Sequence, residues 1–175
     1  MTVKIVIFSM LALLIFIKFK KELGSLNTHG FYMFFAFESL LVLLFLNIGF
    51  WFHSGFSWYQ MPSWILLAAS LLFALSGFYG LRQYGKPIDD WENTTYLITE
   101  GVFHYIRHPL YSSLILLNLG IFLKNINLLS TVAYLISTGF LVAASKVKEK
   151  ENHAKFESAY EEYMMKTKLY FPFIL

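Results

Sequence analysis

The 175-residue sequence contains no cysteine, only four prolines, and few charged side chains, at 14% of its residues. The absence of cysteine excludes disulfides, thiolate nucleophiles and zinc–thiolate sites. The scarcity of charge argues against a soluble domain, because 57% of the residues are hydrophobic, whereas soluble domains have roughly 45–50%. The composition therefore predicts an integral membrane protein.

Apolar runs predict an all-α fold with five transmembrane helices, at residues 1–19, 31–52, 62–81, 110–123 and 128–144. A helix that crosses a membrane needs roughly 20 residues. The first run reaches this length only if it begins at residue 1, and the last two runs are shorter. No small-residue cleavage signature follows the first run, which favours a retained helix over a signal peptide. The whole chain, 1–175, is expected to be a single membrane domain.

The basic residues predict how the chain is oriented. Residues 18–29, 82–108 and 145–175 contain twelve of the fourteen lysines and arginines. By the positive-inside rule, these segments face the cytosol of a cytoplasmic-type membrane. The net charge of +3 therefore reflects membrane orientation, and no nucleic-acid partner is expected.

A polar segment is followed directly by an apolar run, and Arg107, His108, Pro109 and Tyr111 stand at the junction. We call this junction the polar seam. Pro109 suits the first turn of a helix, because it has no N–H to lose and its φ angle is preset. The unpaired N–H groups of a helix N-terminus, together with Arg107 and His108, can hold an anion. In the alternative interpretation, the two cations merely mark the membrane–water boundary.

Acidic residues stand out at two other places in the sequence. Glu38 lies within the second apolar run, where a carboxylate indicates function, an ion pair or a protonated form. It lies about two turns into the run, so it could equally reach toward the membrane interface. Asp89, Asp90 and Glu92 form an acidic cluster. No second cluster accompanies it, so we interpret it as a solvated loop and predict no metal site.

The segment 145–175 is charged, but Phe156, Tyr160 and Tyr163 have the spacing of one helical face. One interpretation is an ordinary amphipathic helix at the membrane interface. In the other, the helix folds back over the polar seam and closes a pocket. Pro172 ends the pattern.

Two strings at the seam, LITEGVF at 97–103 and YIRHPLY at 105–111, resemble the signature of the integral-membrane isoprenylcysteine carboxyl methyltransferases and the related phospholipid N-methyltransferases. The resemblance covers roughly residues 95–175 and includes the aromatic face of the C-terminal helix. It implies S-adenosylmethionine as methyl donor, S-adenosylhomocysteine as product, and a lipidic or prenylated acceptor, either a small molecule or a protein. It also implies that residues 82–175, with a helical hairpin at 109–144, form a cytosolic cofactor pocket covered by the C-terminal helix.

Transferred residue by residue, the resemblance implies cofactor contacts at Thr95, Tyr96, Leu97, Ile98, Phe103, His108, Pro109, Leu110, Tyr111 and Glu149. The chemistry is compatible, because a sulfonium against the ring of Phe103 or Tyr111 gains about 0.5–2 kcal/mol. Methyl transfer is an in-line displacement that depends mainly on positioning and water exclusion. Arg107 and Glu149 are the predicted catalytic residues, nearest the reacting groups, and neither is assigned as a base.

The chain departs from the family pattern at several positions. One of them, Ser113 where glycine is common, exchanges one small residue for another. Lys148 precedes Glu149 where the family usually has two glutamates, and Ala144 stands where an arginine meets a substrate carboxylate. Either Lys146 or Lys148 can supply that charge. Thr95 stands where the carboxyl methyltransferases tend to have histidine.

Three alternatives to an isoprenylcysteine carboxyl O-methyltransferase-like enzyme remain open at this stage. The first is a phospholipid N-methyltransferase. The second is a nicotinamide-dependent membrane reductase, since membrane sterol reductases are similar over the same region but usually longer. The third is a membrane scaffold without turnover. The acceptor and the oligomeric state are not determined by the sequence.

Overall fold

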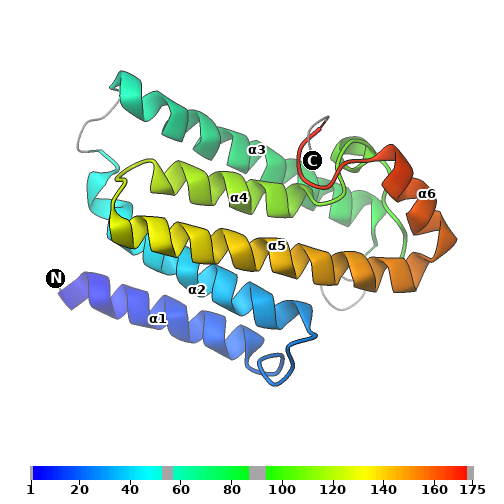
Figure 1. The fold of residues 1–175 in the computed structure, drawn as a ribbon, viewed down its shortest axis with the longest axis horizontal. Helices are drawn as coiled ribbons and strands as arrows, with labels where there is room; N and C mark the ends of the chain where they lie inside the picture. Colours follow the sequence, from blue (N-terminus) through cyan, green and yellow to red (C-terminus); the bar gives the residue numbers. More distant parts are fainter. Residues whose placement is uncertain (1, 53–56, 87–93, 173–175) are drawn as a thin grey trace. The chain divides into compact units, whose positions relative to one another are not determined.

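The computed structural model describes residues 2–52, 57–86 and 94–172, apart from the side chain of residue 59 (Figure 1). Its elements are the α-helices α1 (Thr2–Phe19), α2 (His29–Asn47), α3 (Met61–Tyr84), α4 (Pro109–Phe122), α5 (Leu128–Phe156) and α6 (Ser158–Lys166), and the short 3-10 helices η1 (Ile48–Phe50), η2 (Trp58–Gln60) and η3 (Gly101–His104). The described residues contain no β-strand, and an isolated bridge pairs Ile106 with Lys168. The predicted all-α fold is confirmed.

Among the described residues, four helices are long and apolar enough to cross a membrane: α1, α2 with η1, α3 and α5. They carry exposed large apolar side chains, such as Leu13, Leu72 and Leu135, and such a surface suits hydrocarbon. The remaining predicted span, α4, has 14 residues and is about 21 Å long at the α-helical rise. The count of five spans therefore stays a prediction.

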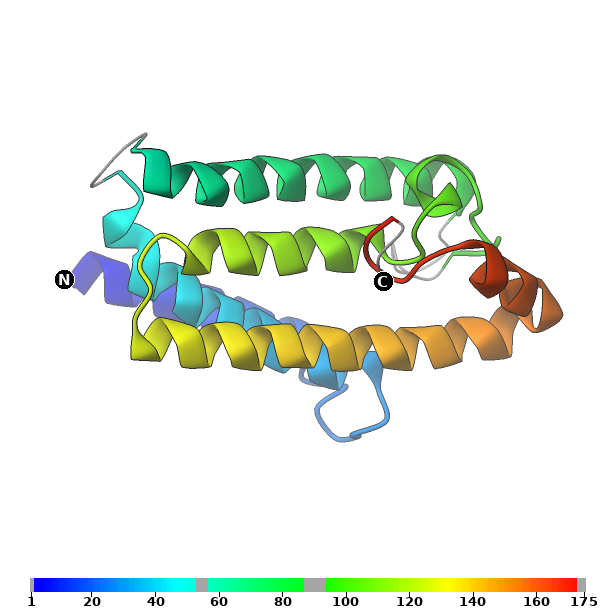
Figure 2. The same ribbon diagram turned by 45° about the horizontal axis from the view of Figure 1, so that its top comes forward.

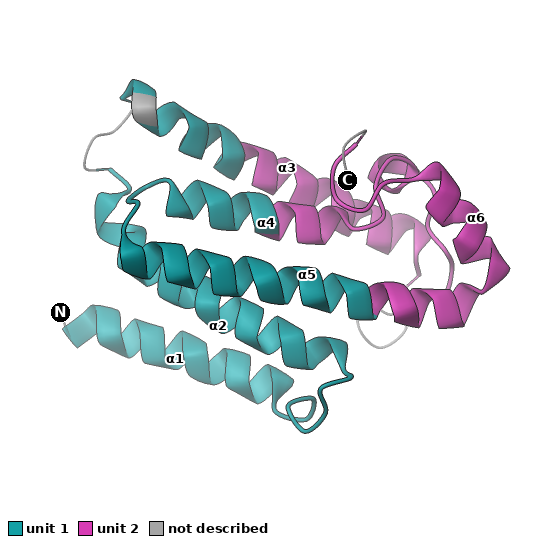
Figure 3. Cartoon of the chain, viewed as in Figure 1, with its two compact units in different colours: residues 1–67, 115–147 teal, residues 68–114, 148–175 magenta. Residues whose placement is uncertain are grey.

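The chain forms two compact units, which Figure 3 distinguishes by colour. Unit 1 comprises residues 1–67 and 115–147, and unit 2 comprises residues 68–114 and 148–175. The single membrane domain expected from the sequence, with a cofactor region beginning at residue 82, stays a prediction.

Unit 1 contains α1 and α2 side by side (Figures 1 and 2). Aromatic rings join its helices, including a stacked pair of Phe35 and Phe140 with centroids 5.0 Å apart. Buried polar groups add interhelical hydrogen bonds, such as Asn47 Nδ2 to Ser130 Oγ at 3.0 Å. In a membrane, packing and hydrogen bonds of this kind drive helix association, because lipid is as apolar as the helix surfaces.

Unit 2 contains the end of α5 and all of α6, and here the structure refines the predicted hairpin. Helix α5 continues beyond residue 144 to Phe156, since lysine, glutamate and alanine in this stretch favour helix. Glu157 then breaks the helix with a φ of 48°, and α6 follows. The predicted aromatic face is therefore divided, with Phe156 ending α5 and Tyr160 and Tyr163 on α6.

Candidate functional site

The seam at residues 105–108 is held by the backbone of the C-terminal segment. Arg107 N–H donates to the Lys168 carbonyl at 2.8 Å, and His108 N–H donates to the Leu169 carbonyl at 3.1 Å. Lys168 N–H in turn donates to the Tyr105 carbonyl at 3.1 Å. The chain enters this region through Gly101, whose φ of +62° is readily adopted only by glycine. The C-terminal segment thus satisfies the polar backbone that precedes α4.

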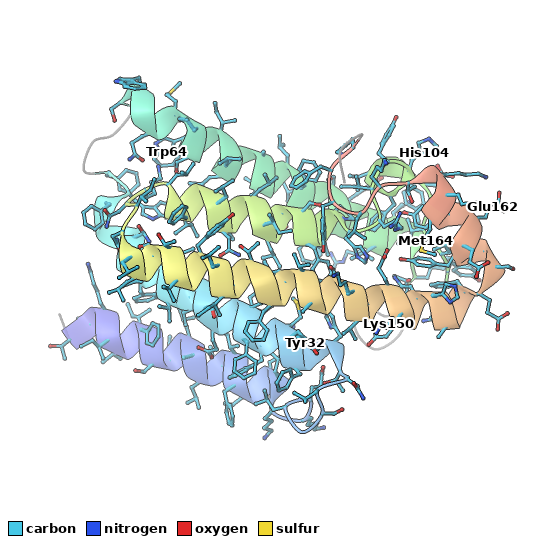
Figure 4. The ribbon with its side chains drawn as sticks, viewed as in Figure 1. Tyr32, Trp64, His104, Lys150, Glu162 and Met164 are labelled. Carbon is cyan, nitrogen blue, oxygen red and sulfur yellow. The ribbon has the colours of Figure 1, made fainter. Side chains whose placement is uncertain are left out.

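The Arg107 side chain connects the seam to both C-terminal helices. Its Nε donates to Glu149 Oε1 at 2.7 Å, and its Nη1 donates to the Thr167 carbonyl at 2.6 Å. A weaker contact of 3.4 Å reaches the carbonyl of Met164, which Figure 4 labels on α6. Helix ends leave carbonyls without intrahelical partners, and a basic side chain is well suited to satisfy them. The guanidinium is therefore largely engaged by the protein itself.

Two tyrosine side chains of α6, Tyr160 and Tyr163, form hydrogen bonds near Arg107. Tyr163 Oη donates to the Phe103 carbonyl at 2.6 Å, and Tyr160 Oη donates to Glu149 Oε1 at 3.2 Å. Burial, reinforced by the nearby Glu149 carboxylate, raises the pKa of Tyr160 to about 12. Burial likewise raises the pKa of Tyr163. Both phenols therefore keep their protons at neutral pH and act as hydrogen-bond donors.

A cleft within unit 2 contains about 620 Å³ of empty space, including the part open to solvent. Its aromatic lining consists of Phe103, Tyr111, Phe156, Tyr160 and Tyr163. Its polar lining consists of Thr94, Arg107, His108, Lys148 and Asn152. A mostly apolar cleft with a few convergent polar groups has the composition of a small-molecule site.

His108 is the buried polar side chain of this lining, with 5% of its surface exposed. Its ring meets Tyr111 edge to face, with centroids 5.3 Å apart. Nε2 lies 3.4 Å from Glu149 Oε1, yet among the described residues it has no hydrogen-bond partner. Burial lowers the pKa of His108 below its ordinary value of 6.5, so the imidazole is neutral at pH 7. The cleft wall thus contains a polar atom that a ligand can satisfy.

Of the predicted cofactor contacts, those that line the cleft are Leu97, Ile98, Phe103, His108, Pro109, Leu110 and Tyr111. Thr95 and Tyr96 are exposed and do not line it. Thr95 Oγ1 instead donates to the Lys86 carbonyl at 2.8 Å. Glu149 also stands outside the lining, bound to Arg107. The roles assigned to these residues stay predictions.

Lys148, Phe156, Tyr160 and Tyr163 also line the cleft, although they were not among the predicted cofactor contacts. Three further lining residues, Leu81, Thr94 and Asn152, were not singled out from the sequence for any role at the site. The sequence could have identified Asn152. Lys148, Asn152 and Phe156 are four residues apart along α5 and therefore lie along one side of the helix. The predicted acidic cluster, Asp89 to Glu92, lies outside the described residues. Within the described part of the chain, no group of three or more histidines and carboxylates could hold a metal ion.

Comparison with protein families matches residues 58–157 to the phospholipid methyltransferases. The match covers more than half of the chain and most of the cleft lining. The chain belongs to the phospholipid methyltransferase family. This membership confirms the resemblance found in the sequence and, with the four long apolar helices, indicates a membrane methyltransferase that acts on lipid. No curated protein and no solved structure matches the chain.

Proposed function

We propose that this member of the phospholipid methyltransferase family transfers a methyl group from S-adenosylmethionine to a lipidic acceptor. The cofactor would bind in the unit 2 cleft, at the cytosolic membrane boundary, and the acceptor would enter from the bilayer. The observation that carries this proposal is the unsatisfied Nε2 of buried His108 in an aromatic-walled cleft. The five-span topology and the cytosolic orientation are part of the proposal, on the basis of the basic segments.

The lining residues fit the chemical groups of this cofactor. The rings of Phe103, Tyr160 and Tyr163 suit a sulfonium cation and a purine. Leu110 and Tyr111 occupy the first turn of α4, where helix N–H groups are suited to a carboxylate. His108 Nε2 and the Asn152 amide can form hydrogen bonds with amino or hydroxyl groups.

The chain's contribution to the reaction is binding and positioning. When bound, S-adenosylmethionine supplies an electrophilic methyl group on its sulfonium. With both reactants bound, the aromatic walls would limit the access of water to them, and an aligned pair of reactants can gain roughly 7–11 kcal/mol from positioning alone. Arg107 and Glu149 hold one another, so we propose that they position the cleft walls and do not act on the acceptor directly.

Two acceptor classes are proposed, a phospholipid headgroup and an isoprenylcysteine carboxyl group. Family membership supports a lipid acceptor and is compatible with both classes. The departure at residue 144 weakens the case for the prenylcysteine, because Ala144 is fully buried and carries no charge.

The decisive experiment measures transfer of a labelled methyl group from S-adenosylmethionine to lipid. The purified protein is incubated with a total lipid extract or with a prenylcysteine analogue, and products are identified by mass. We expect a labelled lipid and binding of S-adenosylhomocysteine by calorimetry. Absence of both, or binding of NADPH in place of S-adenosylhomocysteine, would refute the proposal and favour a scaffold or a reductase.

Gly80 on α3 provides a test of the cleft wall. A Cβ atom there would lie 2.8 Å from the ring of Phe103, so Gly80→Ala forces the ring to move. We expect S-adenosylhomocysteine binding to weaken about threefold, a modest packing effect. The matched control is Gly139→Ala on α5, where a Cβ atom meets nothing within 4 Å. Equal affinities of the two variants would contradict the placement of Phe103 in the binding site.

A further inference from the structure

The cleft lining contains positively charged side chains but no negatively charged ones. Its charged side chains are those of Arg107 and Lys148, and none of the lining residues is a carboxylate. The Arg107 guanidinium already donates hydrogen bonds to Glu149 and to the Thr167 carbonyl. His108 is neutral at pH 7, because burial lowers its pKa. The charge that remains for a ligand is therefore the Lys148 ammonium.

In the structure, Lys148 pairs with Glu151, and this carboxylate would compete only weakly with an anionic ligand for the ammonium group. Lys148 Nζ lies 3.3 Å from Oε2 of Glu151, whose side chain is 45% exposed. The Lys148 side chain is itself 18% exposed, but water screens the exposed Glu151 carboxylate, so this ion pair is weak. An anion inside the cleft has a less hydrated environment and interacts more strongly with the same ammonium.

The other lysines of this part of α5 do not share the position. Lys146 and Lys150 are exposed, and Figure 4 labels Lys150 on the helix. Two residues along an α-helix correspond to a rotation of about 200°, so these neighbours lie on different faces from Lys148. The structure thus distinguishes Lys148 from two lysines of the same chemistry and nearly the same sequence position.

We propose that Lys148 is a specificity-determining residue that binds the anionic group of the lipid acceptor. The shared chemistry is a singly charged oxyanion, either a phosphodiester or a carboxylate, near the atom that is methylated. This inference rests on the proposed function, because it requires the acceptor to enter the same cleft as the cofactor.

The test measures binding of two pairs of lipids, in each of which one member has an oxyanion and the other lacks it, to the full chain in a neutral detergent. Dihexanoylphosphatidylethanolamine is compared with dihexanoylglycerol, and N-acetyl-S-farnesylcysteine with its methyl ester. Each is titrated by calorimetry with and without S-adenosylhomocysteine. The variants are Lys148→Met, which keeps most of the apolar stem, Lys148→Arg, which keeps the charge, and the control Lys150→Met.

We expect the unaltered protein to bind one lipid with an oxyanion about fivefold or more tightly than the partner that lacks it, a difference typical of a single charge-assisted contact. Lys148→Met should remove this preference, while Lys148→Arg and Lys150→Met should retain it. The pair that shows the preference identifies the anion as phosphate or carboxylate.

Three results would overturn the inference. In the first, the unaltered protein shows no preference for either lipid with an oxyanion. In the second, the preference survives in Lys148→Met. In the third, Lys148→Met weakens S-adenosylhomocysteine binding as much as lipid binding, which assigns the lysine to the cofactor carboxylate. If S-adenosylhomocysteine does not bind the unaltered protein, the proposed function fails. The titrations without it still measure the role of Lys148.

Discussion

Replacement of Arg107 by alanine is expected to detach α6 from the seam and to weaken S-adenosylhomocysteine binding about a hundredfold or more, since removal of one partner from a partly buried ion pair costs about 2–4 kcal/mol. The side chains of Arg107 and Glu149 are only 12% and 23% exposed. The variant also removes the donor to the Thr167 carbonyl. Because α6 contributes Tyr160 and Tyr163 to the cleft, its release opens the binding site.

Limited proteolysis and calorimetry measure this effect. Trypsin should cleave after the exposed Lys166 and Lys168 faster in Arg107→Ala than in the unaltered protein. Arg107→Lys should not restore binding, because an ammonium cannot reproduce the planar fork that reaches two acceptors. The control is Arg82→Ala, an exposed arginine of the same unit. Unchanged proteolysis and affinity in Arg107→Ala would show that α6 is held by other contacts.

His108→Ala is expected to weaken S-adenosylhomocysteine binding about tenfold or more, the loss expected when a buried hydrogen-bonding group of a ligand site is removed. Tyr111→Ala should have a similar effect, because its ring packs edge to face against His108. Both affinities are measured by calorimetry at pH 7.5. Unchanged binding in both variants would contradict the assignment of the site.

A pH profile of stability tests the burial of His108. The unfolded chain takes up a proton near the ordinary value of 6.5, whereas the folded chain does so only at lower pH, because burial lowers the pKa of His108. The stability associated with the neutral imidazole is therefore fully present above about pH 6.5 and is lost as the pH falls below that value. His108→Gln should show a smaller decrease in melting temperature over this range. An identical decrease in both proteins would show that His108 does not titrate in this way.

Local patterns were sufficient to predict the helices. The apolar runs marked α1, α2 and α3 to within a few residues, because helix formation in a membrane depends on the length and apolarity of a contiguous segment. Pro109 marked the first residue of α4 for an equally local reason. The break at Glu157 carries no proline or glycine signal, and it was not predicted.

The roles of the polar residues depend on contacts between segments that are far apart in the sequence. Thr95 and Tyr96 are neighbours of Leu97 and Ile98, yet they are exposed and do not line the cleft. Only the folded chain decides which side of this irregular segment is covered, because it has no helical or strand period to reveal its buried face.

The sequence by itself determined that this is a membrane protein with a polar seam before α4, since composition, hydropathy and proline geometry are properties of the local chain. The tertiary structure decided how the charges at that seam are used. It pairs Arg107 with Glu149, buries His108, and places Lys148 in the cleft while Lys150 stays exposed. Such choices depend on which partner each charge reaches after packing, and a buried charge without a partner is too costly to remain unpaired.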